Sequence, residues 1–166
     1  MLADNSLRQL AVIGGDLVNA RDVAILPDGG FIVTNYGWGD LYTLRYDAQG
    51  KPLRLPMKNM YFTGTVFDPV GNMCYVGKTY GSVWSVDLET NTYSLIRNDI
   101  AGTPFNGTYF LSIADGKLWM LSEKGFITAY DPKTGEMSAP MVHHDYPLRG
   151  IAIYECVKHG FVIRMR

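Results

Sequence analysis

The chain has 166 residues, a hydrophobic fraction of 47% and a formal net charge of -1. This size and apolar content fit one domain with a substantial buried core, which excludes a disordered chain. The balanced charge gives no electrostatic reason to bind nucleic acid or an anionic membrane. No stretch approaches the run of about 18 apolar residues that a membrane helix requires.

The residue content favours an all-β fold. Aromatic residues make up 13% of the chain, with 11 Tyr, and Gly contributes 18 residues. Aromatic side chains favour pleated strands and glycines favour tight turns. The cysteines, Cys74 and Cys156, lie in separate strand-like runs without a CxxC spacing, so we expect two separate buried thiols. Residues 1–16 lack the basic and apolar regions of a secretory signal, and we expect a soluble chain whose compartment stays open.

An internal repeat organises the chain. Aspartates that follow a strand-like run recur 40 and 44 residues apart, at Asp47, Asp87 and Asp131. Glycines of the preceding turns recur at steps of 42, 45 and 44 residues, at Gly29, Gly71, Gly116 and Gly160. Two independent markers therefore give the same period, which is typical of the four-stranded blades of a β-propeller.

Taken in chain order, each unit predicts short strands separated by turn residues. The first unit, 17–57, predicts strands at 21–26, 31–35, 41–46 and 52–57. The second unit, 58–97, predicts strands at 64–67, 73–77, 82–86 and 92–96. The third unit, 98–142, predicts strands at 107–113, 117–121, 126–130 and 136–142.

The last unit, 143–166, is incomplete and predicts only two strands, at 150–155 and 161–166. Segment 6–13 is expected to add an outer strand to it. These pieces fit a single propeller domain of about four blades whose last blade is shared between the termini. They also fit part of a larger ring of six to eight blades, completed by further sequence or by another chain, and another all-β arrangement stays open.

The amino-acid sequence of the repeat resembles that of a known family. Residues 31–37, Phe-Ile-Val-Thr-Asn-Tyr-Gly, and the strand that ends at Asp47 resemble the YVTN-type β-propeller repeat. The second copy is similar at 74–78 and 81–87 but has Gly77 and Lys78 in place of Thr-Asn, and the third copy, at 118–122, keeps only the outline. NHL, lactonase-like and quinoprotein-like propellers share this outline. The resemblance implies a propeller scaffold and says little about activity.

Propellers place ligands at one mouth of the ring, where the loops leading into the innermost strands meet the loops between the second and third strands. Arginines at this mouth can bind an anionic group, and aromatic side chains can stack on sugar rings or peptide side chains. The same arginines can instead pair with nearby aspartates, and the aromatic residues can instead pack between blades. The candidate ligand-binding residues are Arg21, Asp22, Tyr36, Trp38, Tyr61, Asn106, Tyr146 and Arg149.

The sequence offers no complete catalytic or cofactor motif, and we expect no cofactor and no metal. His143 and His144 are adjacent, and in a strand their side chains would point to opposite faces and could not bind one ion together. GxSxG, HExxH and phosphate-binding loops are absent from the sequence.

Three functional hypotheses stay open, and the sequence favours a protein that is not an enzyme. The first is a non-enzymatic propeller module that binds a protein or a carbohydrate through its loop-bearing face, or that joins an oligomer or larger assembly. The second is a metal-dependent lactonase-like hydrolase, with Asn19, Asp22, Asn106 and Arg149 near a divalent cation. The third is a structural component of a surface layer or virion-like particle, whose incomplete ring is completed by a neighbour.

Overall fold

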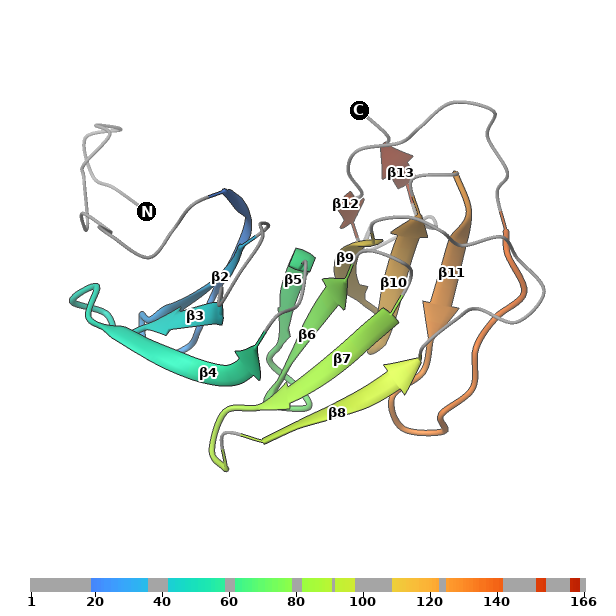
Figure 1. Cartoon of the computed structure of the whole chain (residues 1–166). Helices are drawn as coiled ribbons and strands as arrows, with labels where there is room; N and C mark the ends of the chain where they lie inside the picture. The colour runs from blue at the N-terminus through green and yellow to red at the C-terminus, as the bar shows by residue number, and fades with distance from the viewer. Residues whose placement is uncertain are drawn as a thin grey trace, which may run out of the picture.

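The computed structural model describes residues 19–35, 42–58, 62–78, 82–90, 92–97, 109–122, 125–141, 152–154 and 162–164. Throughout these ranges the chain forms antiparallel strands joined by turns, and they contain no helix (Figure 1). The prediction of an all-β fold is therefore confirmed. The predicted outer strand at 6–13 lies outside the described residues.

The first sheet contains one repeat unit, with its strands paired in chain order. Its strands are β1 (Ala20–Ile25), β2 (Phe31–Asn35), β3 (Tyr42–Tyr46) and β4 (Pro52–Lys58). The β1–β2 turn needs Gly29, whose φ of 78° is a left-handed value that a residue with a Cβ rarely adopts. The Asp28 carboxylate accepts a hydrogen bond from the Gly30 N–H at 2.8 Å and closes this turn. All four strands begin within one residue of the predicted position.

The second sheet repeats this arrangement. Its strands are β5 (Phe62–Asp68), β6 (Met73–Lys78), β7 (Ser82–Asp87) and β8 (Thr92–Arg97), again in chain order. The β7–β8 turn is held by the Asp87 carboxylate, which accepts hydrogen bonds from the backbone N–H groups of Glu89 at 2.8 Å and Thr90 at 3.1 Å. These bonds lower the pKa of Asp87 because they favour the ionised carboxylate. The repeated aspartates are thus turn residues.

The third sheet departs from the predicted pattern at its outer edge. Its strands are β9 (Tyr109–Ala114), β10 (Lys117–Ser122) and β11 (Ile127–Tyr130). A fourth strand is predicted at 136–142, of which the structure describes 136–141. This part forms an isolated bridge between Met137 and Tyr130 and donates two further backbone hydrogen bonds to β11, from Ser138 to Ala129 at 2.8 Å and from Met141 to Ile127 at 2.9 Å, but no regular strand. Beside it the Ser138 hydroxyl, instead of a backbone carbonyl, accepts the Ala129 N–H at 3.0 Å, and Pro140 has no N–H to donate. The prediction of a regular strand here was wrong.

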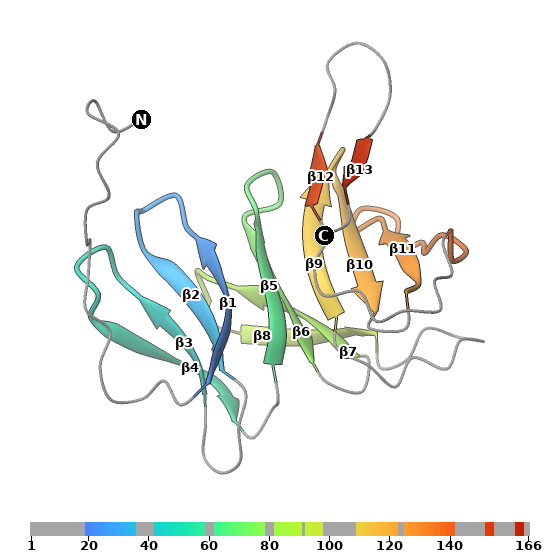
Figure 2. The same ribbon diagram turned by 90° about the horizontal axis from the view of Figure 1, so that it is seen from above.

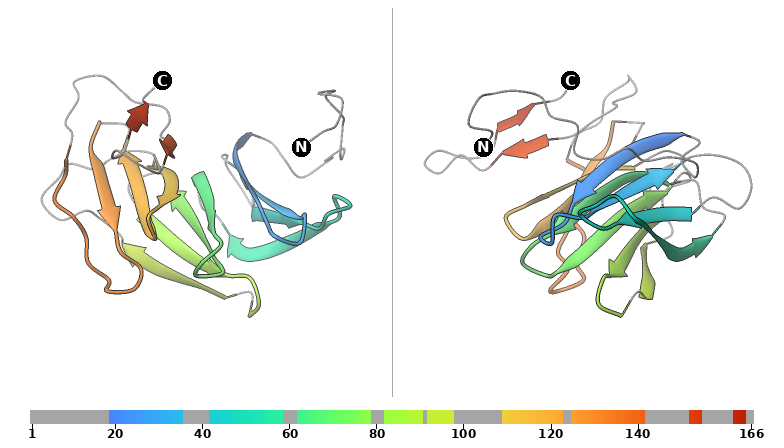
Figure 3. Two further views of the ribbon diagram at one scale, coloured as in Figure 1. Left: turned by 180° about the vertical axis from the view of Figure 1, so that it is seen from behind. Right: turned by 90° about the vertical axis from the view of Figure 1, so that its left-hand side faces the viewer.

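The last described strands, β12 (Ala152–Tyr154) and β13 (Val162–Arg164), pair with each other. The first strands of successive sheets are neighbours, because β1 contacts β5, β5 contacts β9, and β9 contacts β12. The sheets therefore follow one another around these first strands, with the first sheet at one end of the arrangement and the β12–β13 pair at the other (Figures 2 and 3).

Two hydrophobic clusters join neighbouring sheets. Between the first and second sheets the buried residues are Leu26, Ile32, Phe62, Cys74, Val76 and Val86. Between the second and third sheets they are Tyr75, Val83, Leu111, Leu118 and Met120. Cys74 is a buried free thiol, as predicted, and Cys156 lies outside the described residues. The second sheet thus packs one side of its pleat against the first sheet and the other side against the third.

Candidate functional site

The structure describes part of the predicted loop-bearing face. Arg21 and Asp22 lie at the start of β1, with Asn19 just before them. The remaining predicted residues lie outside the described part of the chain, and their ligand-binding roles stay predictions. They are Tyr36, Trp38, Tyr61, Asn106, Tyr146 and Arg149.

Asp22 connects the first two sheets. Its Oδ2 accepts a hydrogen bond from the Thr65 N–H of β5 at 3.0 Å, and its Oδ1 accepts the Val23 N–H at 2.9 Å. Burial raises the pKa of Asp22, and the two backbone hydrogen bonds oppose this shift without cancelling it. Both carboxylate oxygens are therefore engaged by the backbone, and a ligand-binding role for Asp22 stays a prediction.

The residues around Asp22 hold the start of β1 in place. The Asn19 N–H donates to the Asn35 Oδ1 at 2.9 Å, and the Thr34 hydroxyl donates to the Asp22 carbonyl at 3.4 Å. The pairing of β1 with β2 shifts register between Ala20 and Asp22, where Arg21 is exposed. The structure thus brings together Asn19, Arg21 and Asp22 on an ordered strand start.

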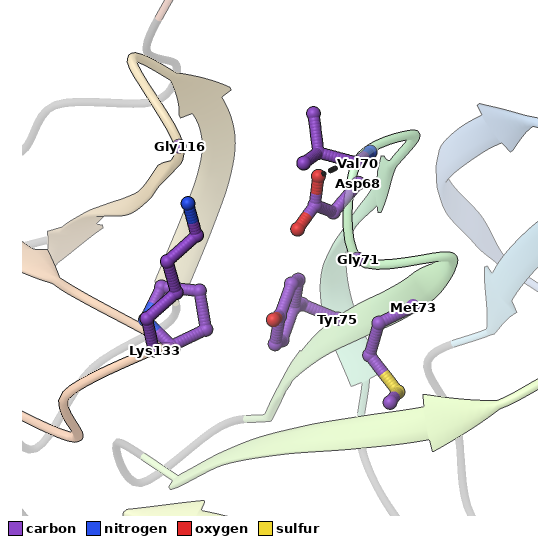
Figure 4. Close-up of a pocket in the computed structure, with 8 residues that line it drawn as sticks. Asp68, Val70, Gly71, Met73, Tyr75, Gly116 and Lys133 are labelled. Atoms are coloured by element: carbon purple, nitrogen blue, oxygen red, sulfur yellow. Dashed lines mark hydrogen bonds between the residues drawn. The ribbon is translucent and has the colours of Figure 1, made fainter.

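A groove lies elsewhere, between the second and third sheets, and the sequence did not predict it (Figure 4). Its volume is about 230 Å³. It opens at the end of β5, whereas the predicted face lies at the starts of the innermost strands. We call it the inter-sheet groove. Its lining residues are Asp68, Val70, Gly71, Met73, Tyr75, Gly116, Pro132 and Lys133.

Asp68 supplies the carboxylate of the inter-sheet groove and is only 3% exposed. Its Oδ1 accepts the Val70 N–H at 2.9 Å, which closes the β5–β6 turn. Figure 4 shows its other oxygen, Oδ2, facing into the groove. A Cβ on Gly71 would lie 2.7 Å from Oδ2, so the glycine leaves this oxygen uncovered.

Tyr75 supplies a phenol from β6. Its ring packs in the cluster between the second and third sheets, and its hydroxyl points into the inter-sheet groove (Figure 4). Burial, followed by the nearby charges of Asp68 and Tyr130, raises the pKa of Tyr75 to about 12. The hydroxyl is therefore neutral at physiological pH and can donate or accept a hydrogen bond.

Lys133 supplies a cation from the opposite wall. It lies in the turn after β11, where its backbone N–H donates to the Asp131 carboxylate at 2.8 Å. Its exposed side chain extends along the wall formed by the third sheet, with the ammonium towards Gly116 (Figure 4). The groove thus combines opposite charges on two walls with the apolar side chains of Val70, Met73 and Pro132.

A sequence signal for the inter-sheet groove exists in the repeat. The equivalent position, at which the innermost strand enters its first turn, is Leu26 in the first unit and Ala114 in the third. Both are buried apolar residues. Asp68 is a charged residue at this core position, and comparison of the three units could have identified it.

Within the described ranges, no three His, Cys, Asp or Glu side chains cluster in a way that could hold a metal ion. The same ranges contain no helix long and apolar enough to cross a membrane.

The sequence matches no family model and no curated protein. Solved structures do match in fold. The computationally designed protein Ika4 is 13% identical with a TM-score of 0.67, and the match covers 96% of this chain and 99% of that chain.

Natural proteins match a shorter share of their own length. An auxiliary nutrient binding protein from Bacteroides ovatus ATCC 8483 is 13% identical with a TM-score of 0.64, over 81% of this chain and 35% of that chain. A chain of the mitotic checkpoint complex is 16% identical with a TM-score of 0.67, over 84% of this chain and 43% of that chain. This chain therefore spans less than half of either natural protein. At these identities the likeness concerns the fold alone, which is all-β and propeller-like.

Proposed function

We propose that this chain is a β-propeller assembly module of about four blades that binds a second copy of itself and so completes a larger ring. The binding surface is the side of the first sheet that points away from the second sheet, which we call the open face. The observation that carries the proposal is the exposure of two large apolar side chains there. Val23 is 52% exposed and Ile25 is 66% exposed.

The alternation of side chains along β1 defines the open face. Leu26 and Ile32, the latter paired with Ala24, pack against the second sheet. Val23 and Ile25 alternate with these residues and therefore point to the other side. Phe31, which pairs with Ile25, lies on the same side and stacks on Tyr46 with ring centroids 4.9 Å apart.

The same side of the second and third sheets is covered by the preceding sheet. By position relative to the turn, Val23 corresponds to Leu111 in the third sheet, and Leu111 is buried against the second sheet. Ile25 corresponds to Phe67 in the second sheet, which packs against the cluster shared with the first sheet. The open face thus has the residues of an inter-sheet contact, and exposed apolar patches of this kind mark interaction sites.

A second copy is the occupant that the arrangement favours. The chain's own last strands, β12 and β13, lie at the far end from the first sheet, and β12 contacts β9 (Figures 1 and 2). The chain matches the whole of Ika4 but only 43% of the mitotic checkpoint chain. Two copies together would approach the length of the mitotic checkpoint chain. The last sheet of one copy would then pack on the open face of the other.

Solution mass tests this proposal. We expect light scattering after gel filtration to give twice the 18.5 kDa of one chain. Ile25→Lys would bury a charge in the contact and should leave single chains. Leu53→Lys is the matched control, because Leu53 is an exposed residue of the same sheet that pairs with Arg45 and so lies on the opposite side. A wild-type chain that stays monomeric, or a dimer that Ile25→Lys leaves intact, would refute the proposal.

A further inference from the structure

We infer that the inter-sheet groove binds a zwitterion of amino-acid size, with its ammonium on Asp68 and Tyr75 and its carboxylate on Lys133. This site is separate from the open face, so the inference does not depend on the proposed assembly. Three polar groups, from Asp68, Tyr75 and Lys133, face this one small space.

The polar groups of the inter-sheet groove are available to a ligand. Across the part of the chain that the structure describes, no hydrogen bond reaches Asp68 Oδ2, the Tyr75 hydroxyl or the Lys133 ammonium. Asp68 is nevertheless almost fully buried. Its Oδ2 faces the groove and has no protein donor among the described residues, so a cationic ligand could donate a hydrogen bond to it.

The balance of charge favours a zwitterion over a simple cation. Asp68 lies on the wall of the second sheet, and Lys133 lies on the wall of the third sheet (Figure 4). A cation alone would pair with Asp68 but meet repulsion from Lys133, and an anion alone would face the reverse. A ligand that carries both charges satisfies both walls. The neutral Tyr75 hydroxyl can accept a hydrogen bond from the ammonium beside Asp68.

The volume and apolar lining of the inter-sheet groove limit the possible zwitterions further. The groove, at about 230 Å³, is smaller than the range of roughly 300–1,000 Å³ that holds drug-sized ligands. Val70, Met73 and Pro132 add apolar surface to the lining. An α-amino acid with an aliphatic side chain therefore matches the groove in size, charge and polarity.

Leucine and its two half-ligands test the inference by calorimetry. Isoamylamine is leucine without its carboxylate, and isocaproate is leucine without its ammonium. We expect leucine to bind the wild-type chain at least about tenfold more tightly than either half-ligand, because each lacks one charge-assisted contact. The Asp68→Asn variant should bind leucine and isocaproate with equal affinity. The Lys133→Met variant should bind leucine and isoamylamine with equal affinity.

Matched controls exist in the first sheet. Asp28 closes the β1–β2 turn through its Oδ1, as Asp68 closes the β5–β6 turn. The backbone N–H of Lys51 donates to the turn aspartate Asp47, as that of Lys133 donates to Asp131. Asp28→Asn and Lys51→Met should keep the wild-type preferences. Gly71→Ala should weaken leucine binding without any change of charge, because the added methyl displaces the Asp68 carboxylate.

Several results would overturn the inference. One is the absence of saturable leucine binding at concentrations up to about 10 mM. A Kd above this concentration means a binding free energy of less than about 3 kcal/mol. Another is a wild-type chain that binds isoamylamine as tightly as leucine, which would make the groove a cation site. Retention of the full preference in Lys133→Met would also overturn it, and this exposed side chain can be changed without unfolding the chain. The monomeric Ile25→Lys variant should still bind leucine, which separates failure of this inference from failure of the assembly proposal.

Discussion

Ile32→Ala tests whether the first two sheets form one cooperative unit. Ile32 is fully buried in the cluster between them, beside Leu26 and Phe62. Removing its side chain leaves a cavity and should lower the free energy of unfolding by about 3 kcal/mol, within the usual range of about 2–5 kcal/mol. For a chain of this length, 166 residues, each kcal/mol lowers the Tm by about 2–4 °C, so the expected loss is about 6–12 °C.

Urea denaturation followed by tryptophan fluorescence measures this loss, because the chain contains 3 Trp. Protein concentration must be fixed, since assembly raises apparent stability. Leu95→Ala is the control, because Leu95 is 43% exposed on β8 and its loss should change stability by less than about 0.5 kcal/mol. A cost below about 1 kcal/mol for Ile32→Ala, or equal costs for both variants, would show that this cluster does not join the sheets.

Two further predictions follow from buried titratable groups. Burial raises the pKa of Cys74 to about 12, so its thiol should resist iodoacetamide at pH 8 in the folded chain and react after unfolding. Mass spectrometry of the peptide that contains Cys74 measures the extent of labelling. Equal labelling in the folded and unfolded states would contradict the prediction. Burial also raises the pKa of Asp22 above 3.8, so the folded state binds this proton more tightly and gains stability as pH falls through the folded pKa towards 3.8. Denaturation between about pH 7 and 4 should therefore show the free energy of unfolding of wild type rising relative to that of Asp22→Asn as pH falls. A difference between the two that stays constant with pH would refute the raised pKa of Asp22.

The strands were predictable because their signals are local. Alternation of apolar and polar residues, Gly29 in a left-handed turn and aspartates that accept turn N–H groups all act within a few residues. The predicted strand at 136–142 failed for a local reason as well, since Ser138 replaces a backbone acceptor with its hydroxyl. These features depend on the chain's own neighbours, and a periodic sequence repeats them.

The candidate sites depend on contacts between sheets, which the repeat alone does not give. The pattern placed Asp22 at the mouth, but the Thr65 N–H that engages it comes from the next sheet, 43 residues away. The inter-sheet groove requires Asp68 from one sheet and Lys133 from another, which come together only when the sheets pack. Sequence reasoning reached the scaffold and missed the groove because the groove is a product of packing.

The position of Asp68 links the scaffold to the inferred ligand. At the position of Asp68 the first and third sheets have Leu26 and Ala114, and in the first sheet Asp28, two residues further along, accepts the turn N–H instead. In the second sheet Asp68 Oδ1 accepts the Val70 N–H, and Oδ2 has no protein donor among the described residues. The groove opens beside this residue, and Gly71 leaves its second oxygen uncovered. Asp68 thus serves the turn through Oδ1, and Oδ2 is the atom to which we assign ligand binding.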